Sequence, residues 1–296
     1  MSFFHSSNDG TDPEYGHLHS PEHANEHEAR AYVDQLWQLA GEYLDDDIQI
    51  AAQNDLMGRF WELYLAAALL DAGIALVPTN QRDLRLGGPD IKVAAPHMFI
   101  EAIVARQGTG PDKVTEAENL VVRSVPKSEI TLRLRAAIDA KHKRYLQYVE
   151  DMVLQPNDPY VVAINGARVP STRGEPYPPW IVGAVFPIGS HVIHIDATSL
   201  EITGESFAHE PHLVKRSGAL VSKGIFLDNS HSGISAVLYC WVDPCNRPDQ
   251  RGRDFIVVHN PFAANPIPRG SLPCGVEAWL DGDNVKLDRK PSPTGA

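Results

Sequence analysis

With 296 residues and 43% hydrophobic side chains, the chain has enough apolar material for the core of one large domain or two small ones. No apolar run reaches the roughly 20 residues that a membrane-spanning helix needs. The chain has three cysteines, Cys240, Cys245 and Cys274, a small and odd number that does not suit a disulfide framework. Because the first residues also lack the basic and apolar regions of a secretion signal, we expect a cytoplasmic protein.

The net charge of −12 is unevenly distributed. Residues 1–50 contain eleven acidic side chains and one arginine, so they carry −10 and leave −2 for the other 246 residues. The body of the protein is therefore near neutral. Local basic surface is compatible with this balance, but the sequence shows no strong footprint of a polyanion partner.

Residues 1–25 are rich in His, Ser, Asp, Gly and Pro, a composition that predicts a disordered acidic tail. His23 and His27 would share a helix face and are the best candidates for a metal site there. No cysteine or clear carboxylate arrangement accompanies them, so a solvated tail is the favoured interpretation.

Two helices are expected next. Apolar residues at helical spacing predict an amphipathic helix over residues 29–44. Asp55 can cap a second helix that runs to about Asp71 and ends at Gly73. This second helix is apolar nearly all round, which predicts burial, and Glu62 is its only acid between residues 56 and 70. Glu62 either pairs with Arg59 one turn earlier or faces a site, and both interpretations stay open.

Three strands follow, over residues 74–78, 82–93 and 99–105. The second carries Asp90 and the third carries Glu101, the only charged residue between positions 98 and 104. A continuous apolar run predicts a strand that is buried on both faces. An ionised carboxylate in such a strand costs several kcal/mol unless another group compensates its charge.

A long helix is predicted over residues 128–154. Lys141 lies within its apolar stripe, between Ile138 and Tyr145, which points this lysine toward the core, although a lysine extending from the edge of the stripe to solvent is the alternative. A buried strand over residues 160–164 follows. The rest is β-rich, with strands expected at residues 180–186, 191–196, 234–242 and 254–259. We therefore divide the chain into a tail (1–25), a helical N-terminus with an α/β core (26–170) and a β-rich extension packed on the same domain (171–290).

Asp90 and Glu101 lie on strands that should be hydrogen-bonded neighbours, about 4.8 Å apart. Two carboxylates at about 4 Å repel by roughly 4 kcal/mol at a protein-like effective dielectric. A divalent cation would remove that repulsion, and ligation by oxygen alone favours Mg²⁺ or Mn²⁺ over Zn²⁺.

The order helix–strand–strand–strand–helix–strand, with Pro89-Asp90 on one strand and Glu101 on the next, resembles the PD-(D/E)XK nuclease superfamily over roughly residues 55–165. The resemblance implies a restriction-endonuclease-like α/β fold, a mixed central sheet flanked by helices. It also implies that Asp90 and Glu101 bind Mg²⁺ and that Glu62 joins the site. Ile103 stands where the superfamily has its lysine. Lys141 is the candidate replacement and Lys92, on the same strand face as Asp90, is its competitor.

The function expected from this resemblance is Mg²⁺-dependent hydrolysis of DNA, in restriction, repair or defence. One alternative is a nuclease-like fold that no longer cleaves and serves as a nucleic-acid-binding or regulatory module. A second alternative is a purely structural ion pair between Glu101 and Lys141. The sequence does not distinguish DNA from RNA as the substrate. It also leaves the oligomeric state open, with a homodimer among the options. No membrane partner is expected.

Overall fold

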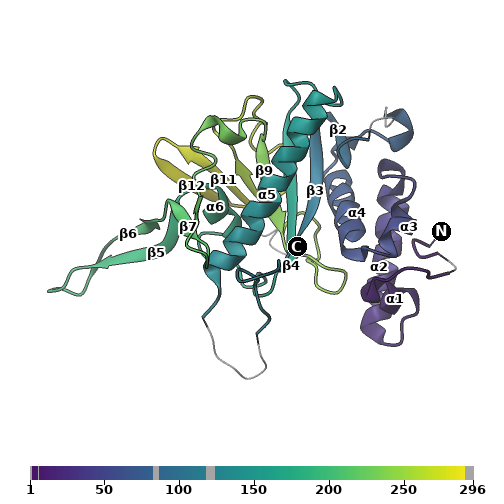
Figure 1. Cartoon of the computed structure of the whole chain (residues 1–296), viewed down its shortest axis with the longest axis horizontal. Coiled ribbons are helices and arrows are strands. Elements are labelled where there is room, and N and C mark those ends of the chain that lie inside the picture. Colours follow the sequence, from purple (N-terminus) through teal and green to yellow (C-terminus); the bar gives the residue numbers. More distant parts are fainter. Residues whose placement is uncertain (1, 6, 83–86, 118–123, 291–296) are drawn as a thin grey trace, which may run out of the picture.

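An eight-stranded mixed sheet forms the centre of the computed structural model, which describes residues 2–5, 7–82, 87–117 and 124–290. The strand order is β1-β2-β3-β4-β9-β10-β11-β12, and Figure 1 shows helices on both sides of this sheet. β3 and β4 run parallel because α5 carries the chain back between them, whereas β2 and β3 form an antiparallel pair. The fold is thus a mixed α/β architecture with a large central sheet flanked by helices.

The elements of the described residues are as follows. The helices and 3-10 turns are α1 (Pro13–His19), α2 (Ala24–Ala40), η1 (Gly41–Tyr43), α3 (Ile48–Ala52), α4 (Leu56–Asp71), η2 (Thr79–Gln81), α5 (Lys127–Glu150), α6 (Trp180–Val185) and η3 (Asn229–His231). The strands are β1 (Ala75–Leu76), β2 (Ile91–Ala95), β3 (Met98–Arg106), β4 (Tyr160–Arg168), β5 (Ile188–Ile195), β6 (Ile202–His209), β7 (His212–Val214), β8 (Leu220–Ser222), β9 (Ala236–Cys240), β10 (Ile256–His259), β11 (Val276–Asp281) and β12 (Asn284–Arg289).

Each face of the sheet packs against its own helices. α4 is buried between one face and α2, which explains why α4 is apolar nearly all round. Trp61, fully buried, donates from Nε1 to the Ala163 carbonyl 3.0 Å away and so ties α4 to β4. α5 and α6 cover the opposite face with residues such as Ile138 and Ile181. Side chains on β3 therefore alternate between an α4 core and an α5 core.

The predicted helices and strands of the first half are largely confirmed. The Asp55 carboxylate caps α4 by accepting from the Gly58 amide at 3.1 Å. The expected strand over residues 82–93 is shorter than predicted, since β2 begins at Ile91 and residues 83–86 lie outside the described part of the chain.

Two expectations differ from the structure. Residues 180–186, expected as a strand, form the helix α6, which is buried against α5 and the sheet. In place of a disordered tail, the N-terminal segment contains α1 and buries Phe3, Phe4 and Tyr15. The Asp34 carboxylate of α2 accepts from the Phe3 amide at 2.6 Å, a long-range contact that composition does not reveal.

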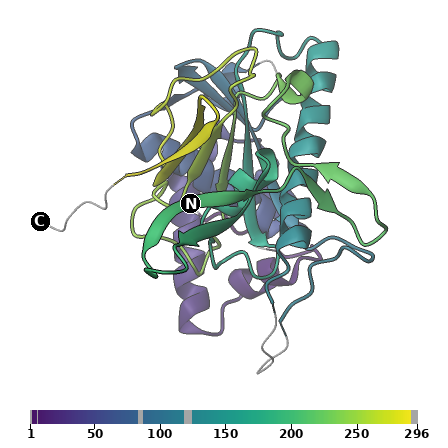
Figure 2. The same cartoon turned by 90° about the vertical axis from the view of Figure 1, so that its left-hand side faces the viewer.

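The C-terminal half extends the sheet and adds a projecting arm. β9 to β12 continue the eight-stranded sheet beyond β4. The β5–β6 hairpin is a separate two-stranded sheet that projects from the body in Figure 1 and faces the viewer in Figure 2. Within the described residues, no helix combines the length and apolar character that crossing a bilayer requires.

Candidate active site

Asp90 and Glu101 meet at the point where β2 separates from β3. The antiparallel register pairs Ile91 with Ile100, so continuing it by one residue places Asp90 opposite Glu101, on the same face of the sheet. Beyond this point β3 runs on without β2 beside it. The Asp90 carboxylate takes the place of the missing strand, because its Oδ2 accepts from the Ala102 amide at 2.6 Å.

Two side chains of α5 contact Glu101. The Lys141 ammonium lies 2.7 Å from Glu101 Oε1, and the Tyr148 hydroxyl donates to Oε2 at 3.3 Å. Tyr148 also lies 2.9 Å from the Gly88 carbonyl, just before Asp90. Glu101 is only 4% exposed, so these contacts hold a carboxylate that has almost no water around it.

α4, which packs on the opposite face of the sheet from α5, contributes a third acid and a guanidinium. Glu62 is buried and pairs with Arg59 at 2.7 Å. Both side chains line a cleft of about 310 Å³ that Lys141, Ala102 and other residues of β3 also line. This volume is at the lower end of the range for ligand pockets. Glu62 thus pairs with Arg59, as one interpretation expects, and also lines a cleft that Lys141 lines.

Burial raises the pKa of all three carboxyl groups. Burial and the nearby Asp90 charge raise the pKa of Glu101 to about 7, although Lys141 and Tyr148 oppose the shift. Burial and Asp90 also raise the pKa of Glu62 well above its usual value. Burial raises the pKa of Asp90, with Lys141 and the Ala102 amide acting in the opposite direction. Three carboxyl groups thus face one ammonium and one guanidinium, an arrangement with an excess of acid.

The geometry invites comparison with known proteins. The chain matches no protein-family model, no curated protein and no solved structure.

The donor set suits a hard cation bound mainly through water. No group of three or more His, Cys, Asp or Glu side chains in the described residues is arranged to hold a metal ion. Mg²⁺, however, keeps several waters and is usually held by only one or two carboxylates together with substrate oxygens. Asp90 and Glu101 supply two such carboxylates at one point, which fits Mg²⁺ or Mn²⁺ and does not fit a closed zinc site.

The structure separates the two candidate lysines. Lys141 contacts Glu101, whereas the Lys92 ammonium lies over the Phe99 ring, 5.4 Å from its centroid. Ile103, at the position where the superfamily has lysine, packs against the α5 core and lines the cleft. Lys141 is therefore the ammonium available to the two acids.

Two residues that support the site carry no clear sequence signal. Arg82 donates to the carbonyls of Val77 and Tyr43 and, at 3.0 Å, to that of Asp90, so it fixes the backbone that presents the Asp90 carboxylate. Tyr148 belongs to the apolar stripe of α5, and its spacing predicts only a core residue. Its contact with Glu101 depends on how α5 crosses β3, which the helical period alone does not specify.

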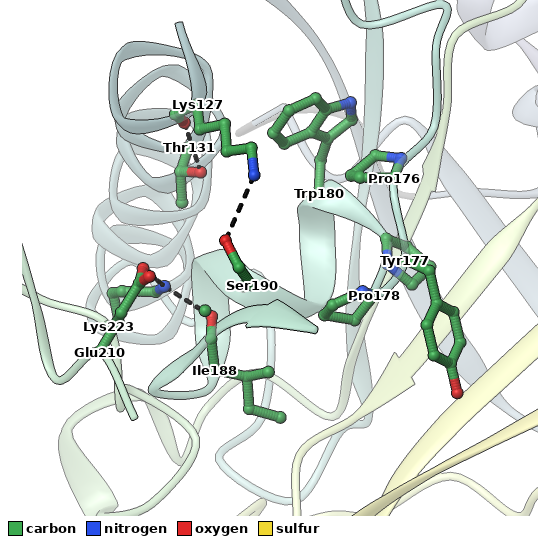
Figure 3. Close-up of a pocket in the computed structure, with 13 residues that line it drawn as sticks. Lys127, Thr131, Pro176, Tyr177, Pro178, Trp180, Ile188, Ser190, Glu210 and Lys223 are labelled. Atoms are coloured by element: carbon green, nitrogen blue, oxygen red, sulfur yellow. Dashed lines mark hydrogen bonds and ion pairs between the residues drawn. The ribbon is translucent and has the colours of Figure 1, made fainter. Parts of the chain in front are cut away.

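The remaining candidates lie elsewhere. His23 precedes α2, where its backbone amide donates to Glu26, and the three cysteines are free thiols, of which only Cys245 is exposed. A second pocket lies at the base of the β5–β6 hairpin, where Lys127 donates to Ser190 and Lys223 to the Ile188 carbonyl (Figure 3). These two hydrogen bonds attach the hairpin to the body of the protein. The pocket volume of about 70 Å³ has room for about two waters and is too small for a substrate.

Proposed function

We propose that the protein hydrolyses phosphodiester bonds of DNA in a reaction that depends on Mg²⁺ or Mn²⁺. The observation that carries this proposal is the convergence of Asp90 and Glu101 on one face of the sheet, with the Lys141 ammonium 2.7 Å from Glu101. The helix–strand–strand–strand–helix–strand order around them supports a restriction-endonuclease-like fold, with the superfamily's lysine supplied by α5 in place of Ile103.

Each residue has a distinct role in this proposal. Asp90 and Glu101 would hold the cation, which would supply Lewis-acid polarisation of the phosphate and a lower pKa for a bound water. Lys141 limits the rise in the pKa of Glu101 and presents a positive charge where negative charge develops on the phosphate oxygens. Glu62 joins as a third acid of the site and faces the cleft, and its pairing with Arg59 limits the cost of its burial.

A second function is favoured by one specific observation. Lys141 forms an ion pair with Glu101, and Ile103 stands where the nuclease motif has its lysine. Both features favour a nuclease-like fold that binds nucleic acid without cleaving it. In that case the Glu101–Lys141 pair serves the stability of the sheet. Metal binding and cleavage separate the two functions.

The test compares wild-type protein with Asp90→Asn and Glu101→Gln. Asn and Gln keep the size of the side chains and, for Asp90→Asn, an acceptor for the Ala102 amide, while they remove the charge. We expect Mn²⁺ binding by calorimetry in the wild type, and plasmid cleavage that both variants reduce by at least a hundredfold while the melting temperature is kept. Cleavage by Asp90→Asn at the wild-type rate would overturn the assignment. Metal binding without cleavage of duplex DNA, single-stranded DNA or RNA would favour the binding module.

A further inference from the structure

Two arginines lie side by side at the carboxyl ends of adjacent parallel strands. Arg106 ends β3, Arg168 ends β4, and the two are register partners across the strand pair. A β-bulge between Val104 and Arg106 brings them into this register. Neighbouring strands are about 4.8 Å apart, and ligands of open α/β sheets bind outside the carboxyl ends of the strands.

These arginines line a groove of about 840 Å³ together with Arg173. Gly108, also in the lining, has φ +79°, and a Cβ there would approach within 2.0 Å of the Arg133 guanidinium, so Arg133 lies directly over this loop. The Arg133 Nε has no hydrogen-bond partner among the described residues. Glu116 is the only acid among the described lining residues, so guanidinium groups dominate the groove.

The present partners of the three lining arginines are carboxylates from distant segments. Arg106 pairs with Asp55 at 2.8 Å, Arg168 with Glu14 of α1, and Arg173 with Asp243 at 2.5 Å.

The side chains of Arg106 and Arg173 are 58% and 61% exposed, but their partners differ, since Asp55 is 37% exposed and Asp243 only 10%. An exposed pair such as Arg106–Asp55 contributes little to stability, so a phosphate oxygen can replace Asp55 at little cost. The Asp243 carboxylate also accepts from the amides of Cys245 and Asn246, so it keeps hydrogen-bond partners when Arg173 turns to a phosphate. Burial lowers the pKa of Arg168, with the charges of Asp243 and Asp12 acting in the opposite direction and that of Arg173 adding to the decrease.

The groove adjoins the cleft beside Glu62 and Lys141, because Arg106 lines both. Arg106 lies five residue steps beyond Glu101 on β3, a length of about 17 Å at about 3.3 Å per residue. A strand of B-DNA covers that length in about five nucleotide steps of 3.4 Å.

We propose that this groove binds the phosphate backbone of the polynucleotide whose scissile bond lies in the cleft, and that Glu14 competes with it for Arg168. The position of the groove relative to a cutting site rests on the proposed function. The binding of a polyanion by these arginines does not. The acidic N-terminal segment thereby limits the affinity of a groove that it partly neutralises.

The test measures binding in EDTA, so that cleavage plays no part. Fluorescence anisotropy is recorded with a fluorescein-labelled 20-nucleotide single strand, its duplex and the matching RNA, over a series of salt concentrations. The variants are Arg106→Ala with Arg173→Ala, and Glu14→Gln. Arg216→Ala is the matched control, since Arg216 is also exposed (66%) and also pairs with one carboxylate, that of Glu129, but is not among the residues that line the groove.

We expect the double variant to bind at least one of the probes about tenfold more weakly at 100 mM salt, with a salt slope that is smaller by about two. Glu14→Gln should bind two- to threefold more tightly, and Arg216→Ala should match wild type. The proposal is overturned if wild-type protein binds none of the probes, or if the double variant binds like Arg216→Ala. If binding depends on the groove arginines but the protein cleaves no nucleic acid, the proposed hydrolysis fails and the groove proposal stands. If cleavage depends on Asp90 but the double variant binds as tightly as wild type, the groove proposal fails and the proposed hydrolysis stands.

Discussion

The Lys141 ammonium and the Glu101 carboxylate lie 2.7 Å apart although they come from a helix and a strand 40 positions apart in the chain. Glu101 sits almost fully buried on β3, and Lys141 reaches it from α5 with its side chain still 19% exposed. Asp90 faces the same point, so Asp90, Glu101 and Lys141 form one charged cluster. We expect its protonation to affect both the free energy of unfolding and the proposed cleavage reaction.

Lys141→Ala should abolish cleavage and destabilise the protein in a pH-dependent way. At pH 8 the substitution leaves the Glu101 charge buried without its cation, which costs roughly 2 kcal/mol of unfolding free energy. At pH 5 Glu101 is protonated and the cost should be smaller. Urea unfolding at both pH values measures the difference. Lys92→Ala is the matched control and should leave cleavage unchanged, because Lys92 lies over Phe99.

The metal-free protein should lose stability as the pH rises from about 4.5 to 7. The folded-state pKa of Glu101, about 7, exceeds its usual value of 4.5, so in this window the folded protein holds a proton that the unfolded chain has released. One such proton gives a slope of at most about 1.4 kcal/mol per pH unit. Glu101→Gln should flatten the profile of unfolding free energy against pH. An unchanged profile in this variant would contradict the raised pKa.

Metal affinity should change with pH in the opposite direction. A cation binds the ionised form of Glu101, so the affinity for Mn²⁺ should increase about tenfold per pH unit below pH 7 and level off above it. Calorimetry between pH 5.5 and 8.5 measures this dependence. An affinity that does not vary over this range would show that Glu101 is not a ligand.

Tyr148→Phe should shift the pH profile of cleavage upward without removing activity. The Tyr148 hydroxyl donates to Glu101 Oε2 and lowers the pKa of that carboxyl, so its loss should move the acidic limb of the rate profile to higher pH. Tyr148 is thus a positioning residue. Tyr145→Phe on the same helix is the control, because Tyr145 packs against Tyr160 and has no contact with Glu101 among the described interactions. An equal shift in both variants would contradict this role.

Periodicity predicts the elements around the candidate site better than it predicts the N-terminal segment or residues 180–186. Glu101 and Lys141 stand out because each is a charge within an apolar period, and the same periodicity predicts α4, β3 and α5. Asp90 stands out only through the Pro89-Asp90 pair on the strand next to Glu101. Residues 180–186 read as a strand because Trp180, Ile181 and Val182 favour strands. The helix forms instead because Glu175 accepts from the Trp180 amide at 2.6 Å and the segment packs into the α5 core. The N-terminal segment is ordered by contacts such as Phe3 with Asp34, which no local pattern encodes.

The single exposed thiol has a practical consequence. Cys240 and Cys274 are buried, so a maleimide dye should attach to the native protein at Cys245 alone. The Cys245 amide donates at 2.9 Å to the carboxylate of Asp243, the acid that also holds Arg173. The protein therefore carries a natural attachment point for an optical reporter at the rim of the arginine groove, and no other cysteine has to be removed to use it.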